Sequence, residues 1–313
     1  MKRIGIKMLI ILVVLVSGIK IYFVIGDCKF KSEYEQMKRD RFMNHETKTG
    51  IEHKTLTFNE NIIHYYASGE QNKPAILFLH PAFSDHTCFY KQIDFFSQEF
   101  RVITIDLIGH GLSEVRNNKD KIDISTEHIL EIIKTENIDK LHIVGVSMGS
   151  LIAQHFALKH PDRTLSLTSL GGYNINRIDK SVEKSQRKEM LSWIIRVIFS
   201  MDSFRRYAGT VSAVNKEEQM KFYESAQGFS RKSFTIMSGL NKLIEDRPDP
   251  PRNYPLLIIA GEKDNDLAKQ MAEIWHLKEP DSKFCIIEQA GHCANMDNAE
   301  SFNNIVYNTI KDT

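Results

Sequence analysis

A serine flanked by glycines stands where a buried strand is expected to give way to a helix. Residues 145–149 read Gly-Val-Ser-Met-Gly and follow the apolar run 141–144. So tight a strand-to-helix turn leaves no room for side chains beside the serine, which explains the glycines. The hydroxyl of Ser147 would then stand at the end of the strand, near the amides that open the following helix. The pattern predicts a nucleophilic serine, and a plain turn with a capping serine is the alternative.

The elements around this serine alternate between short apolar runs and helical stretches. Runs of this kind, bounded by turn residues, are typical of strands buried on both faces of a parallel sheet, and the helices between them imply right-handed crossovers. We therefore predict an α/β fold with a doubly wound, mostly parallel sheet. The expected strands are 55–58, 62–67, 75–79, 102–105, 141–144, 165–170, 256–260 and 283–287.

One block interrupts the alternation. Residues 173–253 are mostly helical in pattern and rich in aromatic residues and methionine. We interpret this block as an inserted helical cap, which divides the core domain into residues 51–172 and 254–313.

The order of the motifs resembles the α/β-hydrolase family, and more closely its cap-bearing serine esterases and lipase-like hydrolases. The resemblance covers about residues 52–310, and it implies the fold predicted above. Besides the serine motif, four segments carry it: 79–83 (Leu-His-Pro-Ala-Phe), 106–113 (Asp-Leu-Ile-Gly-His-Gly-Leu-Ser), 260–264 (Ala-Gly-Glu-Lys-Asp) and 290–292 (Ala-Gly-His).

The resemblance implies a catalytic triad in the chain order serine, acid, histidine. Ser147 would be the nucleophile, His292 the general base, and Asp264 the acid that orients the histidine. In a variant of the family the acid follows the preceding strand, but residues 171–174 (Gly-Gly-Tyr-Asn) offer no carboxylate there. Two nearby carboxylates remain as alternatives for the acid: Asp266 and Glu262.

The resemblance also implies an oxyanion hole made by the backbone amides of Ala82 and Met148. Pro81 stands where the family usually has glycine. Proline has no N–H, but the donor comes one residue later, so the hole is expected to survive with a more restricted loop. The 106–113 loop is structural in the family, so we expect Asp106 and His110 to form the turn rather than act as acid and base.

These residues predict a serine hydrolase that cleaves a carboxylic ester through an acyl-enzyme on Ser147. The apolar side chains of the cap favour an apolar acyl group, so the expected substrate is a small-molecule or lipid ester. An amidase or peptidase of the same fold remains open, because the triad does not separate esters from amides. A ligand-sensing protein on a hydrolase scaffold is the other alternative.

Composition excludes several other classes of function. The 313 residues carry 41 basic and 40 acidic side chains, a net charge of +1, so no basic field for nucleic acid is expected. The four cysteines, at 28, 88, 285 and 293, lack the spacing of a zinc site, and no other metal motif is found. We therefore expect no metal and no cofactor, and the sequence carries no signal for an oligomeric state.

The N-terminus is the one stretch with a non-globular pattern. Residues 8–26 are apolar apart from Lys20, and three basic residues precede them. Nineteen residues of helix span about 28 Å, close to the thickness of a membrane interior. No clear cleavage site follows, so residues 1–26 are predicted to be an uncleaved membrane anchor with the catalytic domain outside the cell; a secreted protein is the alternative. Residues 27–50 are predicted to be a linker.

Overall fold

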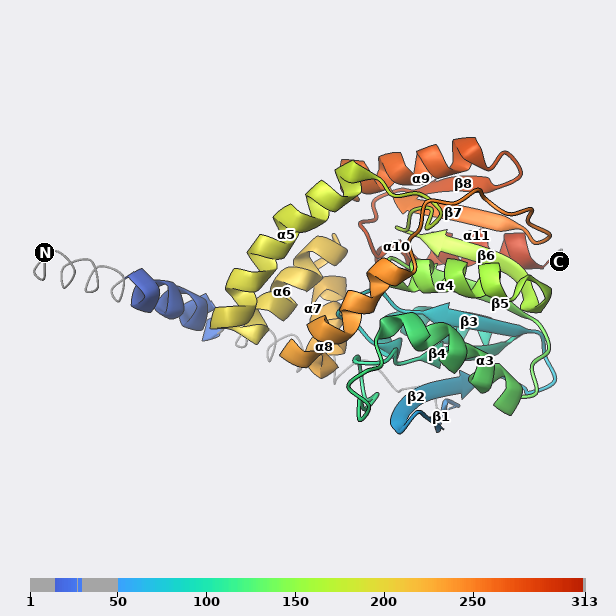
Figure 1. Cartoon of the computed structure of the whole chain (residues 1–313), viewed down its shortest axis with the longest axis horizontal. Coiled ribbons are helices and arrows are strands. Elements are labelled where there is room, and N and C mark those ends of the chain that lie inside the picture. The colour runs from blue at the N-terminus through green and yellow to red at the C-terminus, as the bar shows by residue number, and fades with distance from the viewer. Residues whose placement is uncertain (1–14, 27, 30–49, 312–313) are drawn as a thin grey trace, which may run out of the picture.

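The computed structural model describes residues 15–26, 28–29 and 50–311 of the chain. Eight strands form one sheet in the order β1-β2-β4-β3-β5-β6-β7-β8 (Figure 1). The pairs β1–β2 and β2–β4 are antiparallel, and every other neighbouring pair is parallel. The predicted fold class is therefore confirmed. The strands are β1 (Glu52–Phe58), β2 (Asn61–Ser68), β3 (Ala75–Leu79), β4 (Arg101–Ile105), β5 (Leu141–Val146), β6 (Thr164–Leu170), β7 (Leu256–Gly261) and β8 (Lys283–Ile287).

Helices cover both faces of the sheet and bury its side chains in two apolar layers. The alternation along β3 shows this: Ala75, Leu77 and Leu79 enter one layer, whereas Ile76 and Phe78 enter the other. The first layer is covered by α3 (Ser125–Thr135), α4 (Met148–Lys159) and α9 (Asp266–Lys278). The second is covered by α2 (Tyr90–Phe96) and α11 (Ala299–Ile310). Short helical turns complete the core: η1 (His86–Phe89), η2 (Ile122–Ile124), η3 (Pro161–Arg163) and α10 (Ala294–Asp297).

A run of helices interrupts the sheet between β6 and β7. We call residues 180–242 the helical insertion; it stands beside the sheet rather than over its middle (Figure 1). Three of its side chains, Phe204, Phe222 and Phe229, are fully buried in the second apolar layer, so the insertion packs onto the core. Its elements are α5 (Lys180–Phe199), α6 (Met201–Ser212), α7 (Lys216–Ser225), η4 (Ala226–Gly228), α8 (Arg231–Met237) and η5 (Ser238–Lys242).

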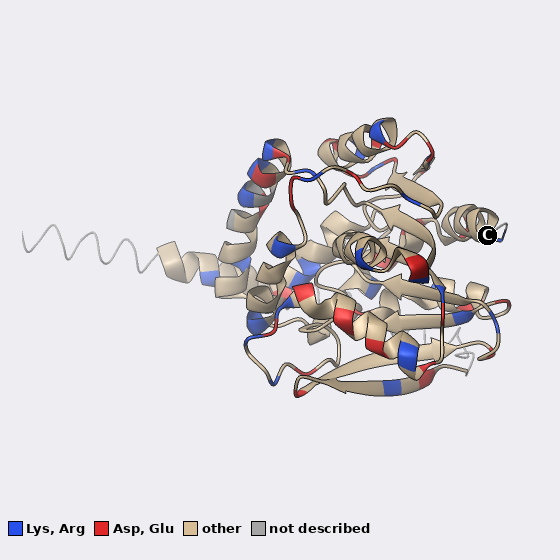
Figure 2. Ribbon diagram, turned by 45° about the vertical axis from the view of Figure 1, so that its right-hand side comes forward, with Lys and Arg blue, Asp and Glu red and all other residues tan. Residues whose placement is uncertain are grey.

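The antiparallel edge of the sheet contains a buried ion pair. A guanidinium nitrogen of Arg101 lies 3.0 Å from a carboxylate oxygen of Glu136, and these side chains are only 3% and 2% exposed. Glu136 also accepts hydrogen bonds from Lys54 (2.8 Å) and Tyr65 (3.0 Å). Most other charges are spread over the surface with both signs mixed (Figure 2), as expected for a net charge of +1.

The structure contradicts the membrane anchor predicted for residues 1–26. Residues 15–26 are helical, and within the described ranges no helix is both long and apolar enough to cross a membrane. The predicted transmembrane helix is therefore wrong, and so is the extracytoplasmic location that rested on it. Residues 1–14 and nearly all of the predicted linker lie outside the described residues.

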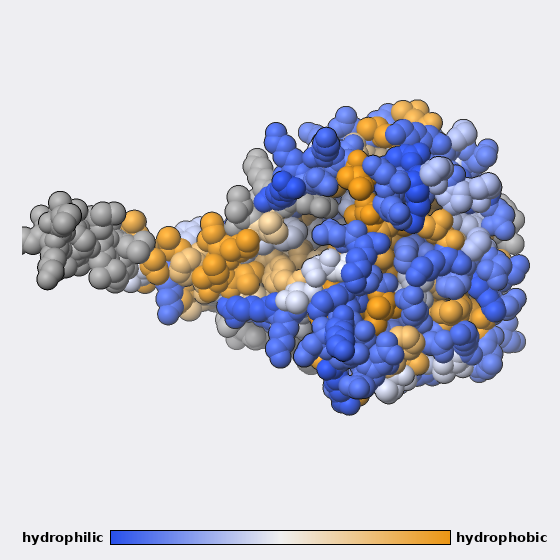
Figure 3. Space-filling model, in the orientation of Figure 1, coloured by the Kyte–Doolittle hydropathy of each residue, from blue (hydrophilic) through white to orange (hydrophobic). Residues whose placement is uncertain are grey.

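The end of this helix contacts the insertion. The ring of Phe23 stacks on Phe199 of α5 at 5.9 Å between centroids, and Arg206 of α6 donates a hydrogen bond of 2.9 Å to the carbonyl of Gly26. Apolar side chains of both segments, among them Ile19, Ile195 and Ile198, remain exposed around the contact (Figure 3).

The buried ion pair predicts a stability change. Replacing Glu136 with alanine leaves the Arg101 guanidinium without its buried partner, so we expect the free energy of unfolding to fall by about 3 kcal/mol in urea denaturation. The matched control removes an exposed pair: Lys134→Ala, whose partner Glu131 is 40% exposed, should change it by less than about 1 kcal/mol. Equal losses in the two variants would contradict the reasoning.

Candidate active site

Ser147 occupies a strained turn between β5 and α4. Its backbone has φ 52° and ψ −114°, a conformation that a residue with a side chain rarely adopts. Such a residue costs about 1–3 kcal/mol and persists only where the surroundings hold it. Here the amide of Ser147 donates a 2.8 Å hydrogen bond to the carbonyl of Leu170 in β6, which fixes the turn to the neighbouring strand.

The two glycines of the motif allow α4 to start against the sheet. A Cβ at Gly145 would lie 2.4 Å from the carbonyl oxygen of Gly149, and a Cβ at Gly149 would lie 2.1 Å from that of Leu79 in β3. No side chain fits at either position. The glycines therefore bring the first turn of α4, and with it the amide of Met148, next to the end of β3.

His292 and Asp264 form a hydrogen-bonded pair. The ring Nδ1 of His292 lies 2.8 Å from Oδ2 of Asp264, whose side chain is 2% exposed, whereas that of His292 is 22% exposed. The other carboxylate oxygen accepts hydrogen bonds from the amide and the side chain of Asn265, at 2.7 and 3.1 Å. Asn265 itself caps α9, so the start of this helix fixes the acid.

The charges around His292 favour its protonated form. Burial by itself lowers the pKa of the imidazole, but the charge of Asp264, its hydrogen bond and the charge of Glu189 in α5 together raise that pKa above its ordinary value. The ring therefore sits where a proton can be taken up and stabilised, as a general base requires.

The carboxyl end of β6 brings the histidine to the serine. Gly171, which follows Leu170, has φ +62°, and a Cβ placed on it would come within 2.9 Å of Cε1 of His292. The imidazole therefore lies on Gly171, one residue past the carbonyl that holds Ser147. Among the described residues, no hydrogen bond joins Ser147 Oγ to His292; such bonds often tighten only when substrate is present.

Ala82 and Met148 supply two amides with no hydrogen-bond acceptor in the described part of the chain. The loop before Ala82 is held by His80, whose ring Nδ1 lies 2.8 Å from the Pro81 carbonyl and whose Nε2 accepts from the amide of Leu107 at 3.0 Å. Burial lowers the pKa of His80 to about 4, so the ring stays neutral and keeps both contacts at neutral pH. Pro81 therefore sits in a loop that His80 ties to the core.

The other residues considered from the sequence lie elsewhere or hold loops. Asp266 is fully exposed at the start of α9, and Glu262 accepts from the amide of Gln289 at 2.8 Å. Asp106 accepts from the amides of His86 and Leu112, at 3.0 and 2.9 Å, which organises its turn. His110 is fully buried, and burial lowers its pKa to about 3. The structure thus places Asp264, and none of these, beside His292.

Asp297 is a residue that the sequence analysis missed. Its carboxylate accepts hydrogen bonds from the amides of Gly291 (2.9 Å), Val214 (3.0 Å) and Asn215 (2.9 Å), so it joins the loop before His292 to the α6–α7 loop of the insertion. The amide of Cys293 adds a 2.7 Å bond to the carbonyl of Ser212. A carboxylate five residues after the histidine was the available signal, but its partners could not be read from the sequence.

One group within the described residues has the composition of a metal site. Ligand atoms of Asp85, His86 and Asp106 lie within 4.8 Å of one another. They are already engaged: His86 Nδ1 lies 2.7 Å from Oδ1 of Asp106, and Asp85 caps η1 by accepting from the amide of Thr87 at 2.9 Å. The group therefore fits a hydrogen-bonded loop support better than an open coordination shell.

Comparison with known proteins now decides the family. Residues 74–299, more than half of the chain, match the family model described as the alpha/beta hydrolase fold. The chain belongs to the α/β-hydrolase family. The 3-oxoadipate enol-lactonase 1 of Acinetobacter baylyi is 33% identical over 120 residues, which span 38% of this α/β-hydrolase and 42% of the lactonase.

Solved structures agree on the fold. A thermophilic esterase from Thermogutta terrifontis superposes with a TM-score of 0.71 at 19% identity, covering 83% of this chain and 98% of the esterase. A bacterial membrane phospholipase A gives a TM-score of 0.69 at 20% identity, covering 100% of this chain and 99% of the phospholipase. At these identities the likeness establishes the fold of the α/β-hydrolase, not its substrate.

The Asp264–His292 pair predicts a change in the pH profile. In Asp264→Asn the charge that stabilises the imidazolium is lost, so the pKa of His292 falls and the acid limb of kcat/KM moves to lower pH. The turnover number should also fall strongly, because the wrong tautomer is favoured. Rates on an activated ester measured across the pH range check both effects. As a control, Asp266→Asn should leave the profile unchanged.

Proposed function

We propose that this α/β-hydrolase cleaves carboxylic esters through an acyl-enzyme on Ser147. The observation that carries the proposal is the Asp264–His292 pair, 2.8 Å apart, with its imidazole on Gly171 next to the strained turn of Ser147. A serine hydroxyl becomes a useful nucleophile when such a base is at hand. The names of the enol-lactonase, the esterase and the phospholipase A also denote ester cleavage.

In the first half of the proposed reaction, His292 takes the proton of Ser147 as its oxygen attacks the ester carbonyl carbon. The carbonyl oxygen becomes an oxyanion, which the amides of Ala82 and Met148 stabilise; one such donor is worth about 3–4 kcal/mol in other enzymes. The bond to the leaving alcohol then breaks, and His292 returns the proton to the alcohol oxygen.

In the second half, a water molecule repeats the sequence. His292 takes a proton from water, the hydroxide oxygen attacks the acyl carbon, and the bond to Ser147 breaks as the serine regains its proton. The carboxylic acid leaves. Throughout, Asp264 holds the ring with Nε2 available and stabilises its positive charge.

We propose an apolar acyl group because the insertion brings apolar side chains next to the loops of His292 and Ala82, and we therefore assign the insertion the role of a cap. Val214 Cγ2 lies 3.3 Å from the position of a Cβ on Gly291, next to His292. Partly buried Trp193, Phe234 and Met237 lie on the same apolar layer. Apolar and aromatic side chains of this kind favour apolar ligands, with a few polar groups fixing the orientation.

Covalent labelling tests the nucleophile. The full chain should react with a fluorophosphonate probe, and Ser147→Ala should lose that reaction while keeping the thermal unfolding midpoint. Ser238→Ala, an exposed serine in the insertion, is the control and should label like the wild type. Labelling that survives in Ser147→Ala, or a folded wild type that never labels, would sink the assignment.

A substrate panel tests the ester preference. Esters of increasing acyl length should be hydrolysed with kcat/KM rising as apolar surface is added, by about tenfold for every 1.4 kcal/mol of added binding energy. Matched anilides measure amide cleavage, and hydrolysis of the anilides at rates equal to the esters would favour an amidase. Labelling without turnover of any ester, together with a ligand-induced thermal shift, would favour a ligand-sensing role.

A further inference from the structure

The residue after the proposed oxyanion donor has an unusual backbone. Phe83 has φ 73°, in the left-handed region that favours glycine, yet it carries one of the largest side chains and is only 8% exposed. A bulky residue in this conformation is a genuine outlier that persists only if its surroundings hold it. The mechanism proposed above uses Ala82 but gives Phe83 no role.

Four aromatic rings surround the side chain of Phe83. Its centroid lies 5.1 Å from Trp193, 5.0 Å from Phe204, 5.1 Å from Phe229 and 6.0 Å from Phe234. The first three pairs cross at 79–86°, the edge-to-face arrangement that aromatic rings prefer. We call these four rings, Trp193, Phe204, Phe229 and Phe234, the aromatic box.

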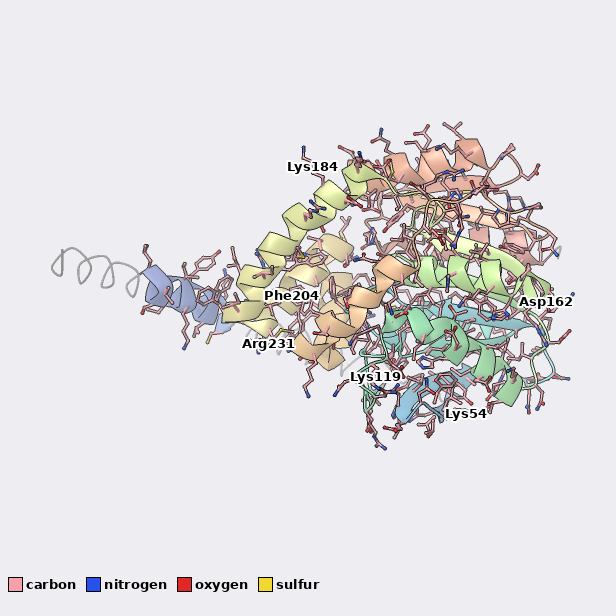
Figure 4. All side chains as sticks on the ribbon, viewed as in Figure 1. Lys54, Lys119, Asp162, Lys184, Phe204 and Arg231 are labelled. Atoms are coloured by element: carbon pink, nitrogen blue, oxygen red, sulfur yellow. The ribbon has the colours of Figure 1, made fainter. Side chains whose placement is uncertain are left out.

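Every ring of the box belongs to the insertion. Trp193 comes from α5, Phe204 from α6, Phe234 from α8, and Phe229 from the turn between η4 and α8. Figure 4 shows Phe204 among the insertion helices, with Lys184 at the far end of α5. Phe83 is therefore a core residue whose side chain is enclosed by the cap.

We infer that Phe83 is a positioning residue through which the cap holds the oxyanion loop in its working conformation. The box holds the ring, the ring holds the backbone of Phe83 at positive φ, and that backbone places the amide of Ala82. If the box opens, Phe83 relaxes to negative φ and the Ala82–Phe83 peptide turns. The backbone of Ala82 shifts with that peptide, and its N–H, which belongs to the preceding Pro81–Ala82 peptide, moves as a result. At its other end, the loop is fixed to the core by His80.

This inference rests on the proposed function, because an oxyanion donor matters only if an oxyanion forms. The positioning role of Phe83 predicts a kinetic effect that a purely structural role does not. A lost donor weakens the tetrahedral state and leaves ground-state binding nearly unchanged, so kcat falls while KM holds.

The first test compares Phe83→Ala, Trp193→Ala and a control, Phe95→Ala, whose partly buried ring packs on Phe96 and Tyr307 in the second layer. For Phe83→Ala we expect kcat on an activated ester to fall about 10- to 100-fold, approaching the loss of an oxyanion donor, with KM within about twofold. The affinity for a boronic acid, which forms a tetrahedral adduct on the serine, should fall by the same factor. Trp193→Ala should change both in the same direction with Phe83 intact, and Phe95→Ala should change neither.

The second test does not need turnover. Hydrogen exchange of the full chain should be faster in peptides spanning 80–86 in Trp193→Ala than in the wild type, with no change there in Phe95→Ala. Unchanged exchange in that segment, or a rise in KM with kcat preserved in Phe83→Ala, would overturn the inference. A wild type that fails to label would overturn the proposed function instead, while the exchange result would still decide whether the cap holds the loop.

Discussion

The site depends on how closely the backbone of α4 approaches the end of β3. A single Cβ at Gly149 would come within 2.1 Å of the Leu79 carbonyl, and one at Gly145 within 2.4 Å of the Gly149 carbonyl. This contact between main chains forces Ser147 into its strained turn and brings the amide of Met148 beside the loop of Ala82. If α4 lay farther from β3, the hydroxyl of Ser147 and the amides of Ala82 and Met148 would no longer lie close together at the carboxyl ends of β3 and β5.

The remaining groups reach that place through separate attachments. Asn265, the N-cap residue of α9, fixes Asp264. Asp264 and Gly171 position the ring of His292, and Asp297 fixes the loop before His292. Asp297 also binds the α6–α7 loop, and Phe83 lies in the aromatic box, so the insertion contacts both the histidine loop and the oxyanion loop. Movement of the insertion would therefore reach both the loop of His292 and the loop of Ala82.

Much of this arrangement could be predicted from local patterns. The apolar runs and the glycines around Ser147 are local patterns in the sequence. The strands of the sheet, the turn at Ser147 and the positions of Asp264 and His292 could therefore be predicted from spacing and from the order of the family's motifs. The box around Phe83 and the bonds of Asp297 to Val214 and Asn215 could not be predicted, because their partners lie more than 80 residues away. The membrane anchor predicted from hydropathy was wrong, because no helix among the described residues is both long and apolar enough to cross a membrane.

The place of the insertion in the chain has a consequence for biosynthesis. Ser147 and the oxyanion loop precede residues 180–242, whereas Asp264 and His292 follow them. The ribosome therefore synthesises Ser147 first, then the insertion, and only afterwards Asp264 and His292 of the proposed triad. In a nascent chain that ends within the insertion, Ser147 has neither Asp264 nor His292 to activate it. Under the proposed mechanism, Ser147 therefore becomes a nucleophile only after β7 and β8 have joined the sheet.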